Sequence, residues 1–383
     1  MAKQSLPDLP GLAPLTIKGD LAEQMVAGIR AYLERETEVA AANRPKRSPA
    51  AARRELARII GVVDEREPTR VEQVTQWWPR LGEGECAEKM DGTIVVQAIR
   101  LSVLRNVDME GLLLLPFPTS HAAVIAIPDA DQTPEMIAGL EPGLPPEAQF
   151  ARRLAERGCM VIIPTTIDRD CEYSGVPGIM TNQPHREFIY RAAFEMGRHI
   201  IGYEVQKVLA AADWLLAGKN KLPVGVMGYG EGGLLALYAA ALDTRIAAAG
   251  VSGYFGPREG LFEEPIYRNV WNLLREFGDA EIAALIAPRK LIIEHSPVPA
   301  VSGPPIREGR SGAAPGKLTT PALTAVREEF NRALTVLGDR KSTMTLTQSN
   351  YPGGDDALSA FLDALGASEP LSDSGKPIRL AAP

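Results

Sequence analysis

Apolar residues recur at three- and four-residue steps between Gly19 and about Glu38, which is the stripe of an amphipathic helix. We expect this helix to pack its apolar face on another surface. A second helix is expected to begin at Ser48-Pro49, a capping serine followed by proline at the first helical position, and to end at about Ile60. Together they predict a helical N-terminal segment, residues 1–90, packed on the core. The stripe consists of Leu21, Met25, Val26, Ile29, Tyr32 and Leu33.

After this segment the pattern changes to short apolar runs and period-two alternation. Thr93–Leu104 and Gly111–Leu115 flank the turn residues Asn106-Val107-Asp108, which predicts an antiparallel pair. Later Val, Ile and Leu runs without alternation are separated by helical stretches, which indicates a parallel sheet covered on both faces. The runs are 122–127, 160–164, 224–227, 246–251, 291–293 and 344–347.

An antiparallel hairpin followed by six parallel strands is the strand plan of the α/β-hydrolase fold, a mostly parallel sheet with helices on both faces. We assign this domain to residues 91–368 and a C-terminal tail to residues 369–383. A long helix is predicted from about Arg186 to Leu216, with a kink near Gly197 or Gly202. The stretches 168–184 and 296–321 carry no clear pattern. Both follow strand ends, where open α/β sheets place their ligands.

Charge and composition narrow the classes of partner. The net charge of -7 argues against nucleic acid, which requires clustered and uncompensated Lys and Arg. No apolar run approaches the roughly 20 residues of a membrane-spanning helix, so we expect no membrane partner. The N-terminus lacks an apolar run behind a basic start, which predicts a cytoplasmic protein or one exported with its signal removed. A homo-oligomer is compatible with the sequence.

Neither a metal nor a cofactor is expected. The three cysteines, Cys86, Cys159 and Cys171, are too few and too irregularly spaced for a disulfide framework or a zinc site, so we interpret them as free thiols. The other His, Cys and acidic residues show no metal-ligand spacing. The chain has no Gly-rich phosphate motif apart from the turn at Gly228–Gly233.

That turn belongs to a segment that reads as strand, sharp turn and helix, Val224–Leu237. Its glycines suit a strained turn followed by a closely packed helix, the context of a nucleophile elbow. In such an elbow the central residue projects above the sheet, and the next backbone N–H helps to bind an oxyanion. The central position here is Gly230, so the turn carries no serine, cysteine or aspartate nucleophile.

Between about Gly197 and Arg289 the chain resembles bacterial esterases of the acetyl xylan esterase and dienelactone hydrolase group. The resemblance implies an α/β-hydrolase fold and an ester hydrolase. It also implies a serine at the elbow, an acid after the next-to-last strand and a histidine after the last strand. The matching phrases are the elbow itself, Gly197–Gly202, Asp213-Trp214-Leu215, Ala239–Asp243, Val251–Phe255 and Ile282–Arg289.

All three catalytic positions implied by the resemblance differ in this chain. Gly230 stands in place of the serine, and the acid position reads Glu294-His295-Ser296. The histidine would lie near Tyr351–Asp356, which contains none. A glycine cannot attack a carbonyl, so the ordinary acyl-enzyme route is closed.

Other ionisable residues gather at the predicted carboxyl edge of the sheet. A carboxylate there could act as nucleophile, as general base or as one of an acid/base pair. The candidate catalytic residues are Glu231, His295 and Asp355. Each also has a structural interpretation, because Glu231 and Asp355 could stabilise helix N-termini and His295 could be satisfied at a strand end. The candidate substrate-binding residues are Asp168, Arg169, His185, Arg186, Tyr229, Arg258, Glu294 and Lys317.

These residues leave two main hypotheses. The first is a hydrolase with a serine-less site that acts through carboxylates on an ester or glycosidic bond of a carbohydrate-type substrate. The second is a catalytically silent protein that binds a small molecule or saccharide in the old pocket. The first requires Glu231, His295 and Asp355 to converge on one point in a closed pocket. A third hypothesis gives the helical N-terminus an assembly role.

Overall fold

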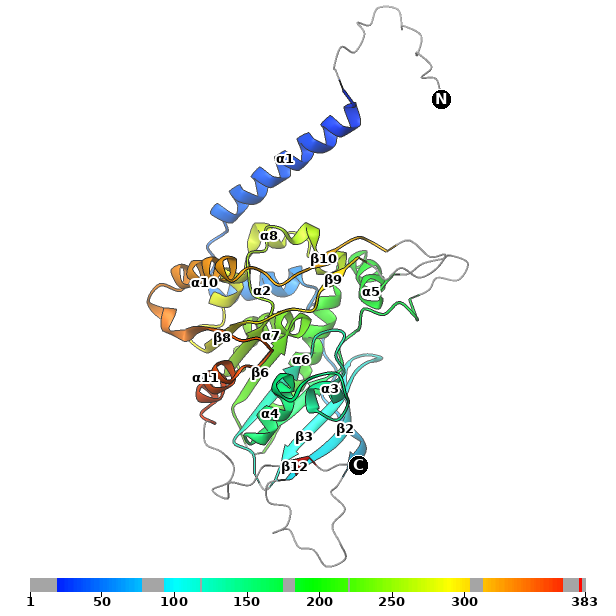
Figure 1. Cartoon of the computed structure of the whole chain (residues 1–383), viewed down its shortest axis with the longest axis vertical. Coiled ribbons are helices and arrows are strands. Elements are labelled where there is room, and N and C mark those ends of the chain that lie inside the picture. Colours follow the sequence, from blue (N-terminus) through cyan, green and yellow to red (C-terminus); the bar gives the residue numbers. More distant parts are fainter. Residues whose placement is uncertain are drawn as a thin grey trace, which may run out of the picture.

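A central sheet with helices on both faces organises the molecule (Figure 1). The computed structural model describes residues 19–77, 93–117, 119–174, 183–219, 221–303, 313–367 and 379–380. The antiparallel lead consists of β2 (Thr93–Leu104) and β3 (Val107–Pro116), with β1 (Val71–Trp77) added along the outer edge of β2. The predicted hairpin is therefore present, and β1 was not predicted.

The parallel part of the sheet continues from β3 through a crossover order, β3-β5-β4-β6-β7-β8-β11. Only the β3–β5 junction is antiparallel, and all later neighbours run parallel. The predicted α/β-hydrolase fold is confirmed. The parallel strands are β4 (Ala122–Ile127), β5 (Cys159–Pro164), β6 (Val224–Tyr229), β7 (Ala248–Ser252), β8 (Lys290–His295) and β11 (Met344–Gln348). The short β12 (Arg379–Leu380) pairs with β2.

Two apolar layers hold the helices on the sheet. One face carries α2 (Pro49–Ile59), α6 (Ile200–Ala217) and α7 (Glu231–Leu242). The opposite face carries α3 (Pro134–Ala138), α4 (Phe150–Glu156) and α11 (Asp355–Leu365). Because strand side chains alternate between faces, each strand contributes to both layers. Both faces of the sheet are therefore buried, as its apolar strands require.

Smaller elements lie around these layers. Helix α10 (Leu323–Leu337) packs against α9 (Asp279–Ala284), and α8 (Leu273–Glu276) precedes α9 in the chain. The two-residue strands β9 (Val301–Ser302) and β10 (Lys317–Leu318) pair with each other. The 3-10 turns are η2 (Pro146–Ala148), η3 (Leu261–Glu263), η4 (Ile266–Arg268) and η5 (Gly338–Thr343). None of the described helices is long and apolar enough to cross a membrane.

The N-terminal helix α1 (Leu21–Ala42) does not pack as its sequence predicts. It projects away from the body (Figure 1), and none of its 22 residues is buried. Near its C-terminal end α8 lies against it. The second helix does pack, since Leu56 and Ile59 of α2 are buried in the core. The apolar stripe of α1 therefore has no partner within the described part of the chain.

The long helix expected at 186–216 is two helices. Helix α5 (His185–Phe194) ends before Gly197, whose φ of +64° reverses the chain. Helix α6 then begins after His199, whose side chain accepts a hydrogen bond from the Ile201 backbone N–H. The sequence indicated the break point, because a glycine with positive φ is a common way to end a helix.

Candidate functional site

The elbow has the backbone of a nucleophile turn. Strand β6 ends at Tyr229, and α7 begins at Glu231. Between them Gly230 adopts φ 57° and ψ -117°, a conformation that residues with a side chain rarely hold. A Cβ on Gly232 would lie 2.2 Å from the Ile127 carbonyl oxygen, so the close approach of α7 to β4 requires glycine there. The local sequence therefore has the elbow geometry with glycine at its central position.

A buried carboxylate, that of Asp129, lies directly over Gly230. Asp129 follows β4, and its Oδ1 accepts a hydrogen bond of 2.9 Å from the Glu231 backbone N–H. That N–H is the one expected to bind an oxyanion. A Cβ on Gly230 would lie only 2.2 Å from the same Oδ1. Asp129 Oδ1 thus lies where the side chain of a nucleophile at position 230 would begin. It also accepts the hydrogen bond of the N–H that would otherwise be free to bind an oxyanion.

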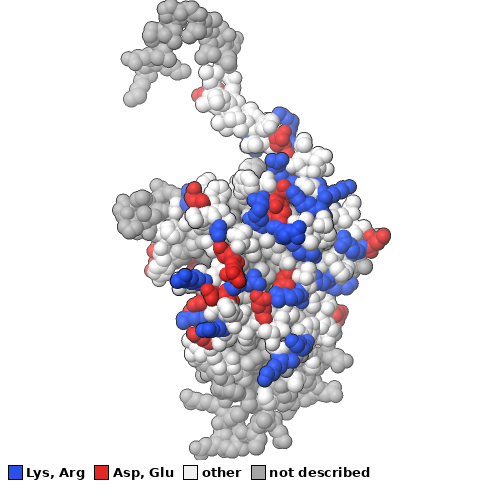
Figure 2. Space-filling view, turned by 180° about the vertical axis from the view of Figure 1, so that it is seen from behind, with Lys and Arg blue, Asp and Glu red and all other residues white. Residues whose placement is uncertain are grey.

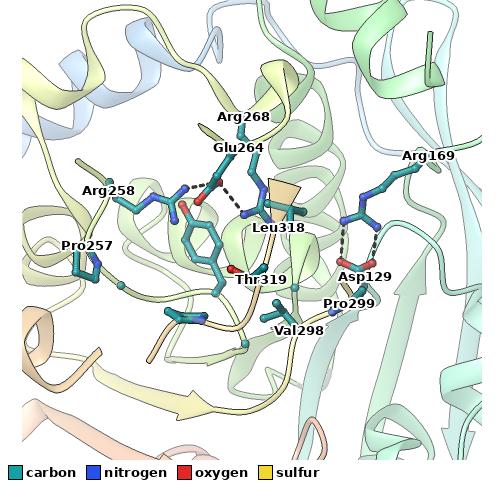
Figure 3. Close-up of a pocket in the computed structure, with 15 residues that line it drawn as sticks. Asp129, Arg169, Pro257, Arg258, Glu264, Arg268, Val298, Pro299, Leu318 and Thr319 are labelled. Atoms are coloured by element: carbon teal, nitrogen blue, oxygen red, sulfur yellow. Dashed lines mark hydrogen bonds and ion pairs between the residues drawn. The ribbon is translucent and has the colours of Figure 1, made fainter. Parts of the chain in front are cut away.

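Arg169 holds Asp129 in this position (Figure 3). Its guanidinium donates to both oxygens of the Asp129 carboxylate, over 2.7 and 3.2 Å, and to Asp131 over 2.8 Å. Its Nε donates to the hydroxyl of Tyr267 at 2.9 Å. Bidentate pairs of this kind are strong and fix orientation. Because both Asp129 oxygens are engaged, this carboxylate is a weak nucleophile in the arrangement observed.

Glu231 is fully buried beneath the turn. Its carboxylate accepts hydrogen bonds from Arg268 at 2.8 Å and from Arg169 at 3.3 Å, and Arg186 lies 3.6 Å away. Burial alone would raise the pKa of Glu231, but the three arginine charges outweigh it and lower the pKa to about 2. Glu231 is therefore ionised at neutral pH and has no proton to donate as an acid.

Further ion pairs extend this cluster. Arg186 forms a bidentate pair with Glu204, with distances of 3.1 and 2.8 Å, and both residues are buried. Arg258 and Arg268 share the carboxylate of Glu264 at 2.7 and 3.0 Å. Four arginines thus face five carboxylates, those of Asp129, Glu204, Glu231, Glu264 and the half-exposed Asp131. Each buried charge has an opposite charge beside it, which offsets the cost of its burial.

Glu294 lies near the end of β8, close to where the resemblance implies an acid, and its contacts connect two loops. Its carboxylate accepts hydrogen bonds from the backbone N–H groups of Gly353 at 2.8 Å and Gly354 at 2.7 Å, and from the Ser252 hydroxyl at 2.6 Å. Burial raises the pKa of Glu294. Gly353 and Gly354 lie in the loop where the resemblance implies a histidine. Glu294 therefore contacts that loop through backbone N–H groups.

The three candidate catalytic residues do not surround one cavity. Glu231 lies under the elbow, whereas His295 ends β8 with its Nε2 3.0 Å from the Pro321 carbonyl oxygen. Asp355 is 72% exposed at the start of α11 and pairs with Arg153. Neither His295 nor Asp355 lines the cavity over Gly230. Their catalytic roles stay predictions that this arrangement does not favour.

The candidate binding residues are divided among several places. Arg169 and Arg258 line the cavity over Gly230, while Arg186 is buried behind it. Asp168 pairs with His185 at 2.6 Å on the surface. Tyr229 is buried and donates to the Pro297 carbonyl oxygen at 2.7 Å, and Lys317 is exposed on β10. Sequence reasoning missed Asp129, Asp131, Glu264, Tyr267 and Arg268.

Arg169 separates two hollows at this edge of the sheet. The inner cavity, about 80 Å³, is bordered by Gly230, Asp129, Arg258 and Arg268 (Figure 3). The outer pocket has a volume of about 380 Å³. Its lining is Asp131, Arg169, Asp170, Pro184, Glu187, Pro265, Tyr267, Ala300, Val301, Ser302, Gly303, Ala314 and Gly316. Among the described residues, no group of His, Cys, Asp and Glu side chains could hold a metal ion.

The sheet order and the elbow define an α/β-hydrolase-fold protein. Residues 122–269 match the sequence model of the Dienelactone hydrolase family. The chain therefore contains a dienelactone hydrolase-like domain, which confirms the resemblance to that group. No curated protein sequence matches the chain.

Solved structures share the fold at low identity. A putative acetyl xylan esterase from Bacteroides fragilis has a TM-score of 0.57 and 14% identity, covering 92% of each chain. A CE15 glucuronoyl esterase from Teredinibacter turnerae has a TM-score of 0.54 and 11% identity, covering 83% of each. A glucuronoyl esterase from Solibacter usitatus has a TM-score of 0.50 and 14% identity, covering 82% of this chain and 91% of its own. At these identities the likeness shows the fold alone.

Proposed function

We propose that this chain binds a small carbohydrate-type ligand in the outer pocket and does not hydrolyse it by an acyl-enzyme route. The observation that carries the proposal is the position of Asp129. Its Oδ1 lies where a Cβ on residue 230 would point and accepts a hydrogen bond from the Glu231 backbone N–H, the group expected to bind an oxyanion. An ester carbonyl brought to this point would meet a negative charge instead of a hydrogen-bond donor.

The outer pocket has the size and polarity of a sugar site. Its volume, about 380 Å³, falls within the range of roughly 300–1,000 Å³ for small-molecule sites. Asp131 and Glu187 contribute carboxylates with lone pairs beyond the hydrogen bonds that they accept from Arg169 and from Arg191 and the Ala314 N–H, respectively. Arg169 contributes a positive charge. The Tyr267 hydroxyl accepts from Arg169 and can donate its own hydrogen. Sugar hydroxyls both donate and accept, so a lining of this mixed kind can satisfy them.

The comparisons favour the same ligand class. The matched family is one of hydrolases, and the similar structures carry the names of acetyl xylan and glucuronoyl esterases. These names describe enzymes that act on carbohydrate esters. A chain that retains their fold and keeps a polar pocket at the carboxyl edge of the sheet would retain their ligand class most readily.

Hydrolysis of a carbohydrate ester through a carboxylate is the second candidate. It is favoured by the same Asp129, because this carboxylate occupies the place of the missing nucleophile. Such a reaction would require Arg169 to release at least one Asp129 oxygen. The clamp makes this candidate weaker than binding, and the predicted roles of Glu231, His295 and Asp355 belong to it.

Calorimetric titration with xylobiose, xylotriose and glucuronic acid tests the binding function. The wild type should bind at least one of them. Ala300→Trp should weaken that binding at least tenfold, because Ala300 lines the outer pocket. Ala50→Trp is the matched control, since Ala50 is exposed on α2 and does not line the outer pocket. Equal binding by both variants would contradict the assignment of the pocket.

An ester assay separates the two candidates. Acetylated xylo-oligosaccharides and aryl acetates should remain intact in the presence of the wild-type chain. Turnover that is lost in Asp129→Asn would establish the second candidate instead. Turnover that survives this substitution would contradict both assignments of Asp129.

A further inference from the structure

Helix α1 exposes a continuous apolar surface at the outer end of the molecule. Leu21, Met25, Val26, Ile29, Tyr32 and Leu33 are 42–68% exposed, and Phe262 of the body is 62% exposed beside them. Figure 2 shows that the outer part of this helix carries few charges. Between the helix and the body lies a groove of about 780 Å³. Its apolar walls are Val26, Ile29 and Leu33 on one side and Leu261, Phe262, Val270 and Leu274 on the other.

This surface is larger than a monomer usually leaves open. At roughly 100 Å² for each half-exposed large apolar side chain, the seven residues present on the order of 700 Å². The largest apolar patch on a typical monomer is about 300–600 Å². A standard stable interface buries ~800 Å² on each partner. The exposed apolar area is therefore close to what one side of a stable protein interface needs.

The order of apolar residues in α1 reads nearly the same in both directions about Ile29. Met25 and Leu33 lie four residues to either side of it, and Val26 and Tyr32 lie three to either side. In two antiparallel helices related by a twofold axis at Ile29, Met25 of one copy lies level with Leu33 of the other. Val26 lies level with Tyr32 in the same way. Each level then holds two large apolar side chains, as antiparallel helix packing requires.

We infer that α1 pairs with α1 of a second copy of this chain, antiparallel and with the twofold axis at Ile29, each helix entering the groove of the other. A twofold contact is self-complementary, because each copy supplies one helix and one groove. A membrane surface fits less well, because membrane-surface helices are rich in Lys and Arg and this one carries four glutamates against two arginines.

Molar mass by light scattering, measured over a range of concentrations of the full chain, tests the pairing. The wild type should have twice the mass of one 41.3 kDa chain. Ile29→Glu should give the single-chain mass, because it places two like charges together at the axis. Ala31→Glu is the matched control on the opposite face and should remain a dimer. A wild type that stays monomeric, or an Ile29→Glu dimer, would overturn the inference.

Cysteine cross-linking tests whether the two α1 helices run antiparallel. Each variant also carries Cys86→Ser. Ile29→Cys should form a disulfide between copies on oxidation. Met25→Cys alone should not, because its copies would be about 12 Å apart along the helices, beyond disulfide reach. The double variant Met25→Cys/Leu33→Cys should cross-link again. Efficient cross-linking of Met25→Cys alone would show a parallel pair and overturn the antiparallel arrangement. Since no α1 residue is buried within a single chain, these substitutions should leave the secondary structure of the chain unchanged in circular dichroism.

Discussion

The carboxylate of Asp129 accepts a 2.9 Å hydrogen bond from the Glu231 backbone N–H, the group that in a nucleophile elbow would face an oxyanion. The Asp129 carboxylate therefore occupies the position that an oxyanion would take, and the elbow has no serine. Arg169 fixes this carboxylate from both oxygens and links it to the outer pocket. At this edge of the sheet, buried ion pairs border the outer pocket.

Gly230→Ala should destabilise the chain more than glycine strain alone explains. Gly338 has nearly the same backbone, φ 58° and ψ -121°, with open space around it. Gly338→Ala therefore measures the strain by itself. Gly230→Ala should cost about 1–3 kcal/mol more, because its methyl group would collide with Asp129. Urea unfolding of the two variants gives the difference, and equal costs would mean that Asp129 does not occupy this space.

Glu231 should make stability fall in acid. Its pKa is lowered to about 2 from an ordinary 4.5, so its contribution is complete above pH 4.5 and is lost as the pH falls from 4.5 through 2. The arginine partners make this contribution on the order of 3 kcal/mol. Glu231→Gln should be destabilised at pH 7, and its unfolding free energy should change less than that of the wild type between pH 5 and pH 3. Parallel pH profiles would show that Glu231 is not held in the ionised form.

Asp279 should have the opposite pH dependence. It is buried, one of its oxygens accepts from the Gly256 N–H, and the other has no partner among the described residues. Burial raises the pKa of Asp279 to about 7, with Glu329 adding to the effect and Arg258 opposing it. Stability should therefore be lost as the pH rises from about 4 through 7.

Asp279→Asn removes this ionisation and tests it directly. The unfolding free energy of the variant minus that of the wild type should increase by about 2–4 kcal/mol between pH 5 and pH 8. The exposed Asp355→Asn serves as control and should show no such increase. A constant difference for Asp279→Asn would mean that this carboxyl is already ionised in the folded protein at pH 5.

Glu294 should behave as a structural residue. Glu294→Gln replaces one carboxylate oxygen with an NH2 group, which cannot accept, so the backbone N–H of either Gly353 or Gly354 loses its acceptor. The loss should be about 2–3 kcal/mol in unfolding free energy at pH 7. Ligand affinity should be retained, because Glu294 does not line the outer pocket. A stable variant that no longer binds would instead assign Glu294 to the site.

The fold could be predicted well because its strands are short apolar runs with helices between them. Ala122–Ile127 was placed without error, since both of its faces are buried and turn residues bound it. The N-terminal helix shows the limit of this reasoning. Its stripe predicts an apolar contact but does not say with what, and the described chain supplies no partner.

The candidate site was predicted only in part, because its contacts join residues far apart in sequence. Arg169 was chosen for its place after a strand, and it lies at the centre of the cluster. Asp129 also follows a strand directly, so the same rule could have found it. No local pattern in the sequence indicates that Arg268 pairs with Glu231 or that Arg258 pairs with Glu264. Those pairs depend on the path of the loop after β7.

The most direct test of the central claim is one titration of the wild-type chain with xylotriose carrying an acetyl ester, followed by both calorimetry and product analysis. The account predicts heat of binding that saturates, with the ester recovered intact. Release of acetate at a rate that depends on Asp129 would contradict the account. The Asp129 carboxylate would then act as a nucleophile, whereas the account has it block the oxyanion position.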